Sequence, residues 1–183
     1  MRIPRLLRGA LAAVLLLAAW GIGQITLPED AGQEPFVTTT GVGQGARTRN
    51  LEATVAAART ADRVSAESGW SAEGNWLVVE VEAAAGTASG PATLALAELR
   101  VDGRTYSVTD RTEGIAGTAL VDGVPRAGSL AFELPEQQRG GAATLRLSGA
   151  ADVRSDAVIE VPLDLGALPR EQSLALTPAG WAR

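Results

Sequence analysis

The chain contains no cysteine, no histidine and no lysine. Without cysteine and histidine it has no thiol nucleophile, no disulfide, no Ser-His-Asp triad and no ordinary zinc or haem ligand set. Without lysine it has no Ser-Lys dyad and no Schiff base. The remaining catalytic option is a pair of carboxylates, as glycosidases use, and Glu80, Glu82 and Glu133 are the candidates. We predict that the protein is not an enzyme, and we assign no cofactor, catalytic or metal site.

Aromatic residues are also scarce, at 4% of the chain. Sugar-cleaving clefts usually need aromatic platforms, so this scarcity argues against a carboxylate-based wall-polymer hydrolase. Trp76 opens an apolar run and is predicted to lie in the core. Trp70 and Trp181 lie in turn-like contexts, and we predict that they contact a partner at the surface.

One apolar stretch organises the chain. Residues 9–28 carry no charge and follow Arg2, Arg5 and Arg8. As a helix this segment would be about 30 Å long, the thickness of a bilayer's hydrocarbon core. The arginines retain the N-terminus in the cytoplasm, so the remainder is expected outside, on a single-pass anchor. The alternative is a signal peptide that is cleaved near residues 21–24, which would give a secreted protein. A lipid-anchoring lipobox is excluded because it needs cysteine.

Charge and length limit the exported part. Removing the three N-terminal arginines leaves 13 arginines against 21 acidic residues, a charge of −8. An acidic domain of this kind repels phosphate backbones, so we predict no nucleic-acid partner. About 135 residues remain after the segment and its spacer, which is the size of one domain. We predict an anchor or signal at 1–28, a flexible linker at 29–47, a folded domain at 48–166 and a tail at 167–183.

The exported part has the periodicity of β-strands. In residues 75–84, apolar side chains alternate with Glu80 and Glu82, which predicts a central strand with one solvated face. Residues 48–64 alternate similarly, although their alanines would also permit a short helix, and we choose the strand. Asp102-Gly103 stands between two alternating runs, which indicates a hairpin. Pro162 falls within the last run and places it at a sheet edge or a bulge.

The spacing of these runs predicts an all-β fold of seven or eight short antiparallel strands, at intervals of roughly 8 to 12 residues. An immunoglobulin-like β-sandwich without a disulfide fits this spacing, and a small barrel is the alternative. The predicted runs are 48–64, 75–84, 93–101, 104–109, 118–121, 127–135, 143–147 and 158–165. The tail either folds back onto the sandwich or extends from it.

Three segments carry a resemblance to a known family. Trp76–Val81, Asp102–Tyr106 and Gly128–Pro135 resemble the strand, hairpin and late-strand motifs of telokin-like, immunoglobulin-fold domains in bacterial cell-surface proteins, including relatives of secreted mycobacterial immunoprotective antigens. The resemblance covers about 51–165. It implies an immunoglobulin fold and a place outside the cytoplasm. It transfers no functional residues, and this chain departs from the pattern by lacking the lipobox cysteine.

These observations favour a non-enzymatic, membrane-tethered binding module of the cell envelope. Its expected partner is an envelope or membrane protein, its membrane contact is made by residues 9–28, and its oligomeric state is left open. The alternatives are a structural accessory subunit of a membrane complex and the carboxylate-based hydrolase. Residues 152–156, DVRSD, offer two carboxylates for calcium, but their arginine and their spacing favour a solvated turn.

Overall fold

A computed structural model describes residues 35–86, 92–112, 114–151 and 157–182. The chain divides into two units, 1–34 and 35–183, and the fold below is that of the second. The predicted membrane segment 9–28 and the candidate calcium loop 152–156 lie outside the described residues. The described residues contain no helix, and hence none that could cross a bilayer.

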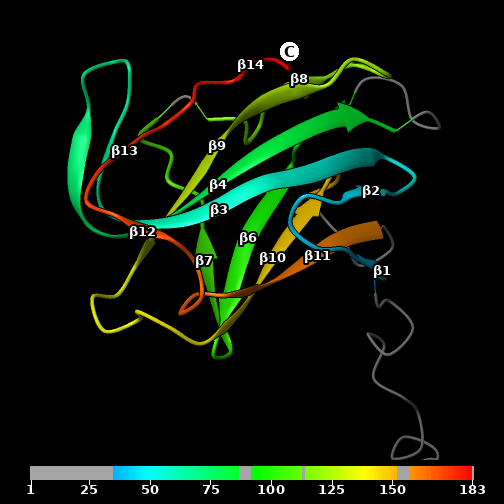
Figure 1. Ribbon diagram of the computed structural model, residues 1–183. Coiled ribbons are helices and arrows are strands. Elements are labelled where there is room, and N and C mark those ends of the chain that lie inside the picture. Colours follow the sequence, from blue (N-terminus) through cyan, green and yellow to red (C-terminus); the bar gives the residue numbers. More distant parts are fainter. Residues whose placement is uncertain (1–34, 87–91, 113, 152–156, 183) are drawn as a thin grey trace, which may run out of the picture. The chain divides into compact units, whose positions relative to one another are not determined.

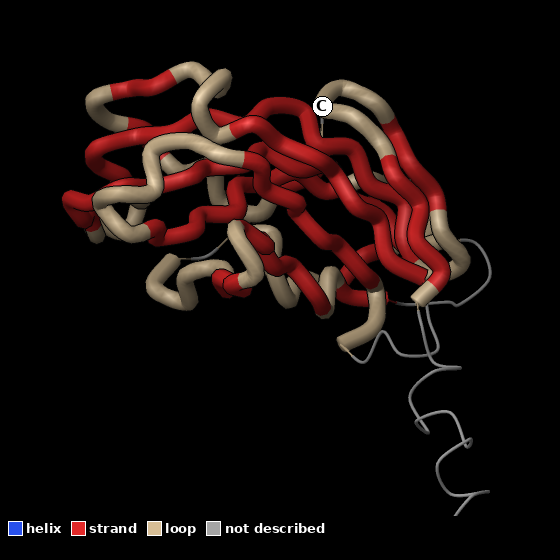
Figure 2. Tube along the Cα trace, turned by 90° about the horizontal axis from the view of Figure 1, so that it is seen from below, coloured by secondary structure: helices blue, strands red, loops and turns tan. Residues whose placement is uncertain are grey.

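Two β-sheets form the domain (Figures 1 and 2). The five-stranded sheet has the order β1-β11-β10-β6-β7, and the seven-stranded sheet contains the path β12-β3-β4-β9-β14, with β2 and β13 also paired to β3. β5 and β8 form a separate pair. The strands are β1 (Phe36–Thr39), β2 (Gly45–Arg47), β3 (Leu51–Ser65), β4 (Ser71–Ala85), β5 (Ala92–Thr93), β6 (Leu96–Val101), β7 (Arg104–Ser107), β8 (Ala119–Leu120), β9 (Arg126–Leu134), β10 (Ala142–Ser148), β11 (Ala157–Asp164), β12 (Arg170–Glu171), β13 (Leu174–Ala175) and β14 (Gly180–Trp181).

The long hairpin β3–β4 is the centre of the seven-stranded sheet. The strand predicted over 75–84 is confirmed, because β4 pairs with β3 on one side and β9 on the other. The run predicted over 48–64 is a strand and no helix from Leu51 onward, where β3 begins. Both strands are 15 residues long, so the prediction of short strands is wrong here. The reason is that Arg63–Ser65 pair with Ser71–Glu73, which confines the turn to 66–70.

The hairpin predicted at Asp102-Gly103 is confirmed. Asp102 has φ 48° and Gly103 has φ 75°, and these two residues join β6 to β7. Two consecutive positive φ angles are those of a type I′ turn, whose twist matches that of the flanking strands. The turn therefore fixes the register that pairs Leu99 with Tyr106.

Pro162 lies in β11, at a point where the strand is paired on one side only. This agrees with the prediction of a sheet edge or a bulge. β1 pairs in parallel with β11 only as far as Glu160, whereas β10 continues to Asp164. The Thr40 amide donates to the Glu160 carbonyl, so even-numbered residues of β11 face β1. The missing N–H of Pro162 therefore falls on the side where no partner strand remains.

One apolar core lies between the two sheets. Inward-facing side chains of both sheets are almost fully buried, and each set follows the predicted alternation along its strand. The largest contributors are Leu51, Val55, Leu77, Val79, Val81, Leu99, Leu130, Phe132, Leu145, Leu147, Ile159 and Val161. The described domain is thus all-β, built of two sheets around a shared interior.

A second apolar cluster lies on the opposite face of the seven-stranded sheet. Trp76, Val78 and Ala131 are buried there beneath Leu174 and Leu176 of the C-terminal segment. β12 and β13 pair in parallel with β3, and β14 pairs with β9. The tail therefore folds back onto the domain. The outer face of β4 is consequently only partly solvated. The prediction that all strands are antiparallel is wrong, because β1, β12 and β13 pair in parallel.

The linker predicted over 29–47 is wrong for its second half. β1 adds in parallel to β11, and β2 pairs with Glu52–Thr54 of β3. The prediction relied on glycines and on the absence of a periodic pattern, but Val37, Thr38 and Thr39 are β-branched and favour extended backbone. The folded domain therefore starts before Thr48, where the sequence had placed it.

Candidate functional site

The exposed end of β14 carries the more accessible of the two tryptophans predicted to contact a partner. Trp181 is 60% exposed, and its strand pairs with Ala127 and Arg126 at the start of β9. The neighbouring turn exposes Val121 and Val124, which bridge to one another across Asp122-Gly123. We call Val121, Val124, Arg126 and Trp181 the β14 patch. It lies around β8 and β14, at the top of Figure 1.

Arg126 holds the indole of Trp181 in place. Its guanidinium carbon lies 4.9 Å from the centre of the Trp181 ring, a cation–π distance. Its Nη1 donates a long bond of 3.5 Å to the Ala119 carbonyl, and its buried Nε has no hydrogen-bond partner among the described residues. The patch thus combines an exposed aromatic ring with the positive charge of the guanidinium that stacks on it. Trp and Arg are the residue types that dominate binding energy at protein interfaces.

A shallow groove of about 420 Å³ adjoins the β14 patch. Its walls are β2 and the turn around Gly123 and Pro125, and its floor is the outer face of β3 and β4. Glu52 is paired there with Arg47 at 2.6 Å, and Glu82 is exposed. Arg47 also lines the groove and balances the charge of Glu52, so Glu82 is the carboxylate that the groove adds near Arg126.

Trp70 differs from Trp181 in its surroundings. It lies edge-on to Trp76, with ring centroids 5.9 Å apart, and is half-buried against the second apolar cluster. Its main role is therefore to cover Trp76. The structure does not bring the two predicted contact residues together into one patch.

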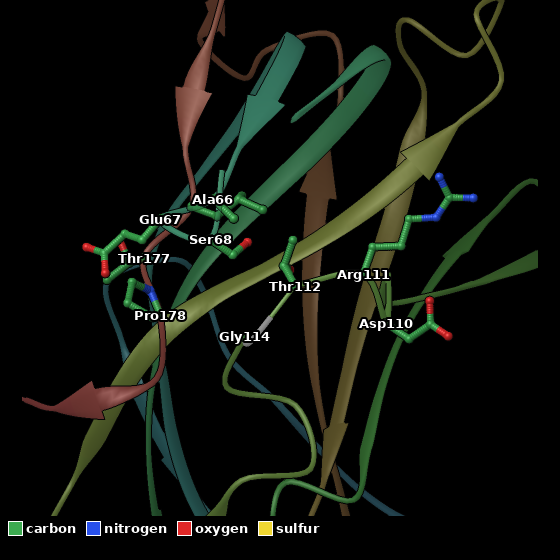
Figure 3. Close-up of a pocket in the computed structure, with 10 residues that line it drawn as sticks. Ala66, Glu67, Ser68, Asp110, Arg111, Thr112, Gly114, Thr177 and Pro178 are labelled. Atoms are coloured by element: carbon green, nitrogen blue, oxygen red, sulfur yellow. The ribbon is translucent and has the colours of Figure 1, made fainter. Parts of the chain in front are cut away.

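A second depression, of about 390 Å³, lies at the other end of β3 (Figure 3). It is lined by the β3–β4 turn, by residues 110–112 and Gly114, and by the tail residues 176–178. Figure 3 shows that the Glu67 carboxylate lies on one side and that Asp110 and Arg111 lie on the other, pointing away from one another. Ser68, Thr112 and Thr177 therefore form its uncharged middle.

The three carboxylates considered for hydrolysis lie on one sheet face. Glu80 accepts a hydrogen bond from Ser129 Oγ at 2.8 Å, and Ser129 Oγ in turn accepts from the Thr177 amide at 2.7 Å. Glu133 pairs with Trp76, four residues along β4 from Glu80, which is about 13 Å. Glu80 therefore helps to hold the tail. Within the described ranges, no three carboxylates gather closely enough to hold a metal ion.

A charged ladder crosses the outer face of the five-stranded sheet. Arg146 of β10 stands in register between Glu98 of β6 and Glu160 of β11 and is only 4% exposed. Its Nε donates to Glu160 at 3.1 Å, its Nη1 pairs with Glu98, and Arg100 also contacts Glu98 at 3.1 Å. The alternation in β10 predicted that Arg146 faces outward. It gave no sign that two carboxylates would bury it.

Polar contacts also fasten β12 to the central hairpin. Arg170 donates to Asp62 and to Asn75 Oδ1, and Asn75 Nδ2 donates to the carbonyls of Pro135 and Gln138 at 2.9 and 2.7 Å. The hydrogen bond from Arg170 lowers the pKa of Asp62 below its usual value. These residues join segments far apart in the sequence, and we assign them a structural role.

Comparison with known proteins finds two solved structures of partly similar fold. One is a Bacillus subtilis protein provisionally described as a lipoprotein, ycdA, with a TM-score of 0.48 at 14% identity over 66% of this chain. The other is a Staphylococcus aureus protein with the same provisional description, with a TM-score of 0.47 at 10% identity over 74% of this chain and 97% of its own. The present chain spans 38% of the Bacillus subtilis protein. No protein-family profile and no curated protein sequence matches the chain.

Proposed function

We propose that the protein is a non-enzymatic, membrane-tethered, immunoglobulin-like module that binds another envelope protein through the β14 patch. The observation that carries this proposal is the exposed Trp181, stacked on Arg126 beside Val121 and Val124. A ring held in this way loses little conformational freedom on binding, which lowers the cost of association. The positive charge of Arg126 beside the exposed apolar side chains suits a partner that presents a carboxylate beside an apolar surface.

The strand order supports the immunoglobulin-like assignment. The order β11-β10-β6-β7 corresponds to G-F-C-C′ of an immunoglobulin variable-type sheet, and β3-β4-β9 corresponds to A-B-E of the opposite sheet. β14 takes the place of strand D beside β9. The N-terminal segment 9–28, with its three preceding arginines, supports a tether to the membrane with the domain outside.

The test has two steps. A photo-crosslinking amino acid at position 181 of the full-length protein, expressed in its own cells, identifies the neighbour by mass spectrometry. The purified neighbour is then titrated with the wild type and with Trp181→Ala. We expect the variant to bind about 30-fold more weakly, which corresponds to the loss of a hot spot of about 2 kcal/mol.

Val42→Ala provides the control, because Val42 is an exposed valine outside the β14 patch. It should leave the affinity unchanged. Equal affinity of the wild type and Trp181→Ala would contradict the proposal. If the affinity disappeared when residues 1–28 were replaced by a cleavable signal, the accessory-subunit alternative would be favoured, since the segment itself would then make the contact.

A further inference from the structure

β1 ends the five-stranded sheet with an uncharged edge. Among the described residues it pairs only with β11, and Phe36 is 78% exposed while Val37 is also exposed. Residues 35–46 contain no charged side chain, and β1 itself contains no proline and no glycine. Natural edge strands usually carry charges, prolines or bulges that prevent pairing with another chain. The opposite edge, β7, begins with Arg104, whereas β1 has none of these features.

The free edge can be assigned to particular backbone groups. The Thr40 amide donates to the Glu160 carbonyl, so Thr40, Thr38 and Phe36 direct their N–H and C=O groups toward β11. Val37 and Thr39 then direct theirs away from the sheet. These four groups are the ones available to an additional strand.

We propose that β1 pairs antiparallel with β1 of a second copy of the chain, about a two-fold axis at Thr38. In this register Val37 of one copy faces Thr39 of the other, and the two residues exchange both backbone hydrogen bonds on each side of the axis, four bonds in all. Thr38 faces Thr38 of its partner as a non-hydrogen-bonded pair. In a two-fold contact each residue meets the same surface of the partner, so like charges would lie opposite one another and repel. An uncharged strand avoids this repulsion.

Membrane tethering favours a second copy over other occupants. Seven residues separate Pro28 from Phe36, so β1 can lie at most about 28 Å along the chain from the apolar segment. Copies held in one bilayer would therefore keep their β1 strands in the same thin layer, at a raised effective concentration. A contact of four residues is too small for a stable dimer in solution. This inference rests on the anchor in the proposed function, and it predicts a dimer that depends on the membrane.

The absence of cysteine makes a direct test possible. In the full-length protein in native membranes, Thr38→Cys should form an intermolecular disulfide, because opposed non-hydrogen-bonded residues lie about 4.5 Å apart at Cα, within disulfide range. Thr105→Cys on β7 is the matched control at the other edge. We expect at least about tenfold more crosslinked dimer for Thr38→Cys, since both positions belong to the same tethered chain but only β1 pairs.

Two further variants test the register. Val37→Cys should crosslink poorly with itself, but it should crosslink with Thr39→Cys when the two are coexpressed. Adding Thr39→Pro to Thr38→Cys removes the outward-facing N–H of residue 39 on each copy and should reduce the amount of crosslinked dimer. The residue before a proline favours extended backbone, so β1 can stay paired with β11. Equal crosslinking at positions 38 and 105, or none at 38, would overturn the pairing. Membrane fractionation of the same samples tests the anchor separately. A released protein that still crosslinks at position 38 contradicts the tether and the dependence of the dimer on the membrane, but it supports the pairing of β1.

Discussion

At the scale of single residues, the structure separates roles that the sequence could not distinguish. Trp70 and Trp181 occupy similar turn-like contexts, yet Trp70 packs on Trp76 and Trp181 projects beside Arg126. Arg146 looks like any outward-facing polar residue of an alternating strand, yet two carboxylates enclose it. These carboxylates belong to Glu98 and Glu160, which lie 48 and 14 positions from Arg146 in the sequence. The pattern within one strand contains no information about them.

Arg146→Ala should therefore destabilise the domain. The change leaves Glu98 and Glu160 facing one another without the guanidinium that paired both of them. We expect a loss of roughly 1 to 3 kcal/mol, the usual cost of leaving a partly buried polar group unsatisfied. Urea denaturation followed by tryptophan fluorescence measures it.

Arg100→Ala is the matched control for this ladder, since Arg100 pairs with Glu98 from an exposed position. Its effect should stay within about 0.5 kcal/mol, as is usual for surface ion pairs. Equal losses for the two variants would show that burial of Arg146 contributes nothing.

At the scale of elements, strands and turns followed the predicted periodicities closely where one face is apolar. β4, β9, β10 and β11 each bury the side chains that their alternation assigned to the interior. Short segments have no such pattern: the prediction was wrong for β1, which it placed in a linker, and it left open whether the tail that contains β12 and β13 packs on the domain. β1, β12 and β13 have four, two and two residues and form because the edges of β11 and β3 accept them. Segments of this length have too few side chains to show a period.

The tail is expected to stabilise the domain through the second apolar cluster. Leu174→Ala removes a buried side chain that packs with Trp76 and Val78, and it should destabilise the fold by about 2 to 3 kcal/mol. Gln172→Ala, an exposed change in the same segment, should have no measurable effect. Thermal unfolding of the two variants, followed by tryptophan fluorescence, makes the comparison. An unchanged midpoint for Leu174→Ala would mean that the tail is not part of the cooperative unit.

At the scale of the whole molecule, the apolar segment 9–28 and the folded domain carry separate information. The apolar segment predicts a location at the membrane, and the folded domain provides the surfaces proposed for binding. The β14 patch lies at the top of Figure 1 and β1 lies at its lower right, so the two proposed contacts use different sides of the domain. A copy paired through β1 would therefore leave the β14 patch free for a different protein.

The anchor gives a prediction for the complete protein. Full-length protein should stay in the membrane pellet after alkaline carbonate extraction, because 20 uncharged residues partition into the bilayer core. Its N-terminal peptide should still contain residues 1–28 when analysed by mass spectrometry. A mature N-terminus near residues 21–24 would show instead that the segment is a cleaved signal.

The sequence by itself determined the all-β class, the long central strand, the Asp102-Gly103 hairpin and the inward-facing residues. These features depend on local chemistry, namely alternation along one strand and the conformations that glycine and proline allow. Only the tertiary structure decided three other features. The tail covers Trp76, two carboxylates enclose Arg146, and the Trp181 ring is exposed to solvent while it contacts Arg126. Each of these depends on which distant segments become neighbours, and that is set by the packing of two sheets on a shared core.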